Sequence, residues 1–175
     1  KMTDKELFES LSYERKNAYL KMTEAEKKEM WEMTDSYRAF LDKGKTEREC
    51  VREAVRMAQE AGFVDIDLLD NLKAGDKVYK INRNKNIFMA VIGSEDIRKG
   101  INIAGAHIDS PRLDLKQNPL YESMDMALLK THYYGGIKKY QWPTVPLAIH
   151  GVIYDTEGKQ REIVIGEEEN DPVFV

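Results

Sequence analysis

The first third of the chain has the hydrophobic pattern of helices, because apolar residues recur at helical spacing among charged ones. Thr23 and Thr46 are each followed three residues later by a glutamate, which is typical of a capping box at a helix N-terminus. Gly44 and Gly62 stand where glycine commonly ends a helix. The pattern predicts three helices: residues 5–19, a helix from Thr23 to Gly44, and a helix from Thr46 to Gly62.

The hydrophobic period changes after residue 76, where short apolar runs alternate with turn residues. Two pairs of such runs predict β-hairpins, 78–81 with 87–92 around "NRNKN" and 145–154 with 161–165 around "DTEGK". Residues 101–106 form a further apolar run, which predicts a short buried strand.

This layout, helical in residues 1–70 and strand-rich in 76–175, predicts an α/β fold. A chain of 175 residues fits one domain, and no boundary is evident inside it. The last residues, "NDPVFV", form a strand-like run with no turn after it, so we expect the domain to continue beyond them.

Composition narrows the function classes. The net charge of −4 argues against a nucleic-acid partner, which would require clustered basic residues. No apolar run is long enough to span a membrane, and the first residues of this sequence lack the charged-then-apolar pattern of a signal peptide. The single cysteine, Cys50, excludes an internal disulfide and indicates a reducing compartment, so we expect a cytoplasmic protein with Cys50 at least half-buried.

The candidate chemistry lies in "GINIAGAHIDSPRLDLK", residues 100–116. In an extended strand His107 and Asp109 would point to the same face. A neutral imidazole is a good zinc ligand, and a carboxylate beside it can orient it. Ser110-Pro111 would then break the strand and place the pair at its end. A histidine with a merely structural role, followed by a turn, is the alternative. A serine-hydrolase triad fails because Ser110 should face away from Asp109.

The segment "AGAHIDSPRLDLK", followed by "NPLYE", "THYYGGIKKYQW", "VPLAIHGVIYD" and "GEEENDPVFV", resembles the M18 family of zinc aminopeptidases. The hallmark of that family is a "GAHTDSP"-type segment, with Ile108 here in place of threonine. The resemblance covers the chain from about residue 78 to its end, and the helical N-terminal part fits the family's opening.

The resemblance implies a zinc-exopeptidase-type catalytic domain with N-terminal helices and a mixed β-sheet, here incomplete. His107 would bind one of two metal ions, and Asp109 would hold and polarise it. The remaining ligands and the general base would lie further along, as would an inserted oligomerisation domain. The implied activity removes N-terminal residues, acidic ones among them, from peptides through a water activated by two metals. Zn²⁺ is the implied metal, with Co²⁺ or Mn²⁺ as alternatives. The resemblance also implies a homo-oligomer, and we expect this chain alone to be inactive.

Other candidates are weaker. His132, Gly135 and Gly136 are candidate substrate-binding residues, because the glycine-rich segment of the family lies near its active site; a tight turn between core aromatics is the alternative. His150 follows an apolar run and is interpreted as structural. The run at 167–171 is interpreted as a solvated acidic loop. Arg112 is either an anion contact or, more simply, part of a surface salt bridge.

Two other classes of function remain open on the sequence. One is a non-catalytic, metal-free scaffold or oligomerisation module. The other is a different zinc exopeptidase or amidohydrolase with a related "HxD" strand. Peptides that are free or blocked at the N-terminus would distinguish an aminopeptidase from the latter.

Overall fold

The computed structural model describes residues 2–13 and 15–175, and these divide into two units. The first unit comprises the chain up to Ala39. It contains the helix α1 (Asp4–Leu11), the 3₁₀ turn η1 (Ala18–Lys21) and most of α2 (Glu24–Lys43). The predicted helix over residues 5–19 is therefore wrong in its second half, because Ser12 already has extended backbone angles and caps α1.

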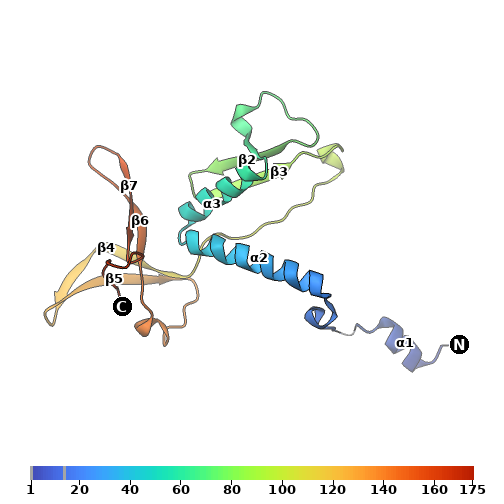
Figure 1. The fold of residues 1–175 in the computed structure, drawn as a ribbon, viewed down its shortest axis with the longest axis horizontal. Helices are drawn as coiled ribbons and strands as arrows, with labels where there is room; N and C mark the ends of the chain where they lie inside the picture. The colour runs from blue at the N-terminus through green and yellow to red at the C-terminus, as the bar shows by residue number, and fades with distance from the viewer. Residues whose placement is uncertain (1, 14) are drawn as a thin grey trace. The chain divides into compact units, whose positions relative to one another are not determined.

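The second unit comprises Phe40–Val175 and contains α3 (Glu47–Glu60) and all the strands (Figure 1). The capping boxes predicted at Thr23 and Thr46 are both present. At the end of α3, Gly62 has φ +84°, and the Phe63 amide donates to the Ala58 carbonyl 2.9 Å away. This is a Schellman ending, which needs a residue that tolerates positive φ.

A three-stranded sheet lies beside α3 in the order β1-β2-β3 (Figure 1). It consists of β1 (Val64–Asp65), β2 (Lys77–Asn82) and β3 (Asn86–Val91), with the 3₁₀ turn η2 (Ile66–Leu68) after β1. The sheet is mixed, since β1 pairs parallel to β2 and β3 pairs antiparallel. The predicted hairpin at 78–92 is confirmed.

Two further hairpins complete the unit. One joins β4 (Arg112–Ser123) to β5 (Met126–Tyr134), and the other joins β6 (Ile149–Tyr154) to β7 (Gln160–Ile165). The 3₁₀ turns η3 (Ile97–Lys99) and η4 (Trp142–Thr144) lie in the connections that lead to them. The second hairpin was predicted, whereas the first was not.

The predicted buried strand at residues 101–106 is wrong. These residues form neither helix nor strand, and Ile101 and Ile103 are exposed. An apolar run forms a strand only when another strand pairs with it, and within the described residues no strand pairs with this one.

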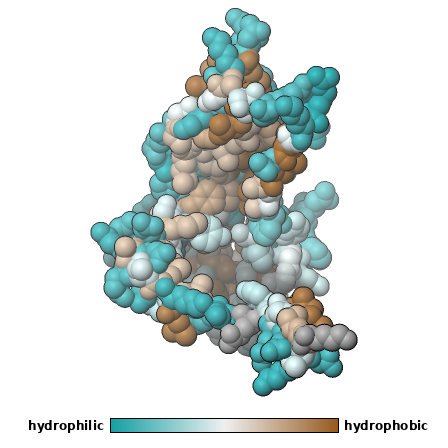
Figure 2. All heavy atoms as spheres, turned by 90° about the vertical axis from the view of Figure 1, so that its right-hand side faces the viewer, coloured by the Kyte–Doolittle hydropathy of each residue, from teal (hydrophilic) through white to brown (hydrophobic). Residues whose placement is uncertain are grey.

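The buried apolar side chains come from α3 and β2: Cys50, Val51, Ala58, Val78 and Tyr79. The burial of Cys50 agrees with the prediction. Many large apolar side chains stay on the surface instead, and Figure 2 shows apolar atoms open to solvent on the face that it draws. None of the helices that the structure describes is long and apolar enough to cross a membrane.

Candidate metal ligand and its surroundings

His107 and Asp109 are in contact, although not through the pleat of a strand. The His107 Nδ1 atom lies 2.8 Å from the Asp109 backbone oxygen and 3.2 Å from its Oδ1 atom. Both neighbours are acceptors, so Nδ1 carries the proton and donates it. In the neutral ring the lone pair is then on Nε2, which is the atom that could bind a metal.

The pair lies in irregular chain ahead of β4, which begins at Arg112, and not at the end of a preceding strand as predicted. The His107 side chain is 82% exposed and that of Asp109 is 32% exposed. The pKa of the Asp109 carboxyl lies below its ordinary value, chiefly because the Tyr134 hydroxyl donates a hydrogen bond to it. Asp109 is therefore held as the carboxylate that accepts from His107.

The described residues supply only part of a metal site. Across 2–13 and 15–175, no three His, Cys, Asp or Glu side chains come together as a group that could hold a metal ion. His132 lies on β5 opposite Asp114 and stacks on Tyr133, with 5.4 Å between ring centroids. His150 is bound by Glu49 and Glu167, so neither histidine completes a set of ligands with His107. His107 fits one ligand position, and a catalytic zinc needs about three protein ligands.

The glycine-rich segment directly follows β5, and its first glycine lies against the site segment. Gly135 has φ +74°, and a β-carbon added there would lie 3.3 Å from the Pro111 Cα atom. At Gly136 a β-carbon would meet open space. Of the two glycines, only Gly135 lies where a side chain would be crowded by neighbouring atoms.

Arg112 forms salt bridges, as one of its two interpretations predicted, but the partners around it were not foreseen. The Arg112 Nε atom lies 2.7 Å from Asp114, and its Nη1 atom lies 3.2 Å from Glu47 at the start of α3. The guanidinium also lies 4.1 Å from the centre of the Tyr134 ring. The spacing of Arg112 and Asp114, two residues apart in a strand, was a usable signal for part of this cluster.

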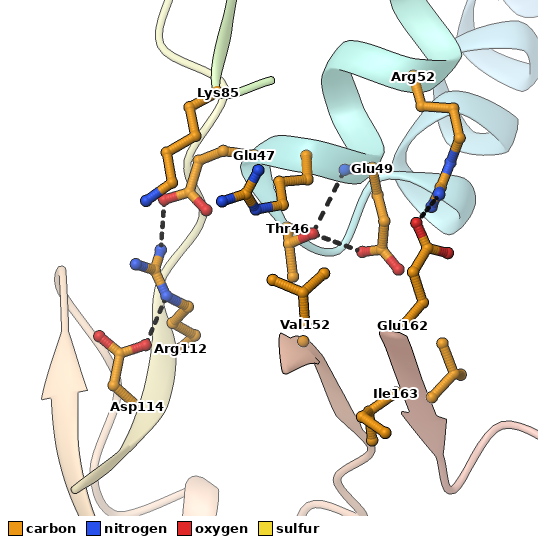
Figure 3. Close-up of a pocket in the computed structure, with 13 residues that line it drawn as sticks. Thr46, Glu47, Glu49, Arg52, Lys85, Arg112, Asp114, Val152, Glu162 and Ile163 are labelled. Carbon is orange, nitrogen blue, oxygen red and sulfur yellow. Dashed lines mark hydrogen bonds and ion pairs between the residues drawn. The ribbon is translucent and has the colours of Figure 1, made fainter. Parts of the chain in front are cut away.

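A charged pocket opens between the start of α3, β4 and the β6–β7 hairpin (Figure 3). Its side chains neutralise one another through ion pairs, such as Arg52 with Glu162 at 2.5 Å and Arg112 with Glu47. Neither His107 nor Asp109 lines it. We interpret this pocket as the junction between α3 and the hairpins, because most of its charged side chains are paired within the chain.

Comparison with known proteins places the chain in a class. Residues 40–175 match the model of the family described as "Aminopeptidase I zinc metalloprotease (M18)". The chain therefore belongs to the M18 family of metallopeptidases, as the sequence motifs predicted.

Individual proteins similar to this chain are also described as aminopeptidases. A probable M18 family aminopeptidase 1 from Clostridium acetobutylicum is 53% identical over 165 residues, which cover 92% of this chain and 36% of the relative. The corresponding Thermotoga maritima protein is 45% identical, over 94% of this chain and 36% of the relative. The crystal structure of aminopeptidase I from Borrelia burgdorferi matches with a TM-score of 0.85 and 43% identity, over 91% of this chain and 40% of that one. The chain thus spans little more than a third of the curated relatives it matches.

Proposed function

We propose that the complete protein is a zinc-dependent aminopeptidase to which this chain contributes His107 and Asp109. The observation that carries the proposal is the His107–Asp109 contact, which fixes the proton on Nδ1 and leaves Nε2 as the metal-binding atom. The M18 family to which the chain belongs supplies the reaction class.

The roles of the two residues follow from this geometry. His107 would bind zinc through Nε2, and Asp109 would hold the ring in one orientation and raise its basicity. Zinc at such a site acts as a Lewis acid and lowers the pKa of bound water. The second metal, the other ligands and the general base would come from the rest of the complete protein. On its own, this chain would bind zinc weakly and be inactive.

Several finer features belong to the same proposal. Peptides are the proposed substrates, with acidic N-terminal residues as the first to test, and Co²⁺ or Mn²⁺ could replace zinc. We also propose a homo-oligomer and a cytoplasmic location. The location is supported by the buried thiol of Cys50, the single cysteine, which fits a reducing compartment.

The test uses the complete protein with peptides whose N-terminus is free or acetylated. We expect hydrolysis of the free peptides only, its loss on chelation, and its return with zinc. His107→Ala should lower kcat/KM more than 100-fold, because losing even an outer partner of a zinc ligand costs about 10- to 100-fold. Release of C-terminal residues would indicate a different exopeptidase, and no hydrolysis with zinc present would indicate a scaffold.

A further inference from the structure

Arg112 is held from three sides at the base of the β4–β5 hairpin. Its Nε atom donates to Asp114 at 2.7 Å, and its Nη1 atom forms an ion pair with Glu47 at 3.2 Å. The Nη1 atom also donates to the backbone carbonyl of Ser110 at 3.4 Å, and Ser110 directly follows Asp109. Arg112 thereby ties the site segment to the first turn of α3, which is capped and is packed through Val51 and Ala58.

Tyr134 provides a second route from Arg112 to the site. Arg112 and Tyr134 are register partners in the ladder, and the guanidinium lies 4.1 Å from the centre of the Tyr134 ring. The Tyr134 hydroxyl and the Asp109 carboxylate interact. The next residue, Gly135, lies close against Pro111, so the end of β5 confines the 109–111 segment.

Because residues 101–108 have no regular structure, these contacts at the hairpin base are what orients the site segment. We propose that Arg112 is a positioning residue, which fixes Ser110 directly and Asp109 through Tyr134, and so aims His107 at its metal. The proposal rests on the proposed zinc site. It replaces the interpretation of Arg112 as an anion contact, and it gives a role to the salt bridges that Arg112 forms.

The charges around Arg112 favour a positioning role over contact with an acidic substrate. Two carboxylates, those of Glu47 and Asp114, already face the single guanidinium, so the cluster carries net negative charge. Such a cluster repels the acidic group that an anion contact would have to attract. The Arg112 side chain is also only 29% exposed, so it is not a simple surface residue.

The experiment measures the zinc affinity of the complete protein by competition with a chelator, together with kcat and KM. Arg112→Met should weaken zinc binding about 10- to 100-fold, as the loss of an outer-shell partner does. The zinc affinity of Arg112→Lys should lie between those of the wild-type protein and Arg112→Met, because lysine keeps the charge but lacks the planar guanidinium. Arg161→Met is the matched control, since Arg161 pairs with Asp155 in the other hairpin and should leave zinc affinity unchanged.

If the Arg112 variants fail to fold, Tyr134→Phe is the variant to test, because it removes only one hydroxyl and keeps the aromatic ring. We expect zinc affinity to fall about two- to tenfold, the value of one hydrogen bond. Tyr121→Phe, on the same hairpin and next to Lys130, is its control. Wild-type zinc affinity in Tyr134→Phe, or in a folded Arg112→Met protein whose melting temperature alone falls, would overturn the proposal. So would a rise in KM confined to acidic peptides.

The outcome for the wild-type protein separates the two proposals. If it neither binds zinc nor hydrolyses peptides, the proposed function is wrong, and the proposed role of Arg112, which depends on it, is wrong as well. If it does both while the variants bind zinc as tightly as it does, only the role of Arg112 is wrong.

Discussion

His150 on β6 and Glu49 on α3 lie 2.8 Å apart, Nδ1 to Oε1, although 101 positions separate them in the sequence. On the other side of the ring, the Nε2 atom lies 2.9 Å from Glu167. Both ring nitrogens face carboxylates, so the protonated ring, which donates from both nitrogens, is the form that this site favours. Residues 167–171 were interpreted as a solvated acidic loop. The Glu167 side chain is indeed 44% exposed, but it pairs with His150, which that interpretation did not include.

This contact makes stability depend on pH. Burial alone would lower the pKa of His150, but hydrogen bonds to Glu49 and Glu167 outweigh it and raise the pKa above 6.5. For Glu49, burial would raise the pKa, but hydrogen bonds from His150 and Thr46 lower it below 4.5. The histidine contribution is complete below pH 6.5 and is lost as pH rises through its raised pKa. The Glu49 contribution is complete above pH 4.5 and is lost as pH falls.

We therefore expect His150→Gln to lower the free energy of unfolding by about 1–2 kcal/mol at pH 6, and by less at pH 9. Denaturant titrations of both proteins at the two pH values measure the difference. His132→Gln is the control, since His132 is exposed and contacts an aromatic ring rather than a carboxylate. A difference that stays constant from pH 6 to pH 9 would contradict the ionic role of His150.

Local signals predicted the parts of the fold that short stretches of chain determine. The capping box at Thr46 needs only residues 46–49, and the hairpin at 78–92 needs only alternation and a turn. The β4–β5 hairpin was missed because its alternation is interrupted. The register shifts between Leu115 and Leu120, and this stretch contains Asn118 with φ 50° and Pro119, which has no amide proton to donate.

Local sequence likewise predicted some features of the candidate site and not others. The spacing of His107 and Asp109 predicted that the two side chains share one face of a strand; they meet at 3.2 Å, but without a strand. It could not predict the absence of a strand before them, because strand formation depends on partners elsewhere in the chain. Likewise, the contact of Arg112 with Glu47 joins β4 to α3, and nothing in either local sequence specifies the other.

A second prediction concerns Glu53, a buried charge on α3. It pairs with Arg56 at 2.6 Å and Lys43 at 3.2 Å, and the hydrogen bonds from Arg56 are the main reason that its pKa falls to about 2. We expect Glu53→Gln to lower the free energy of unfolding by about 1–2 kcal/mol at pH 7, because Arg56 and Lys43 lose a shared partner. The loss should be full above pH 4.5 and disappear as pH falls toward 2.

Glu60→Gln is the matched control for Glu53, since Glu60 pairs with the same Arg56 but is 65% exposed. Exposed pairs contribute about 0–1 kcal/mol, so we expect a smaller loss. Denaturant titration at pH 7 and pH 3 measures both variants. Equal losses would show that burial of Glu53 does not strengthen its pairing.

A third prediction compares two capping boxes in different surroundings. Thr46 accepts a hydrogen bond from the Glu49 amide at the start of α3, which packs in the core. Thr3 makes the same motif with Glu6 in α1, which has no buried residue. Thr46→Ala should cost about 1 kcal/mol of unfolding free energy, and Thr3→Ala should change the main unfolding transition little. Amide exchange in the first turn of each helix provides the check, and slow exchange retained in Thr46→Ala would contradict it.

The last prediction concerns the two adjacent glycines after β5. Gly135 has φ +74° and lies against Pro111, whereas Gly136 has open space where a side chain would be. Gly135→Ala should cost about 1–2 kcal/mol for the left-handed backbone alone, with a further cost for displacing Pro111. Gly136→Ala, with no positive φ to maintain, should be nearly neutral. Thermal unfolding of both variants measures the difference. If the two alanines cost the same, the close packing of β5 against residue 111 is not what holds the site segment.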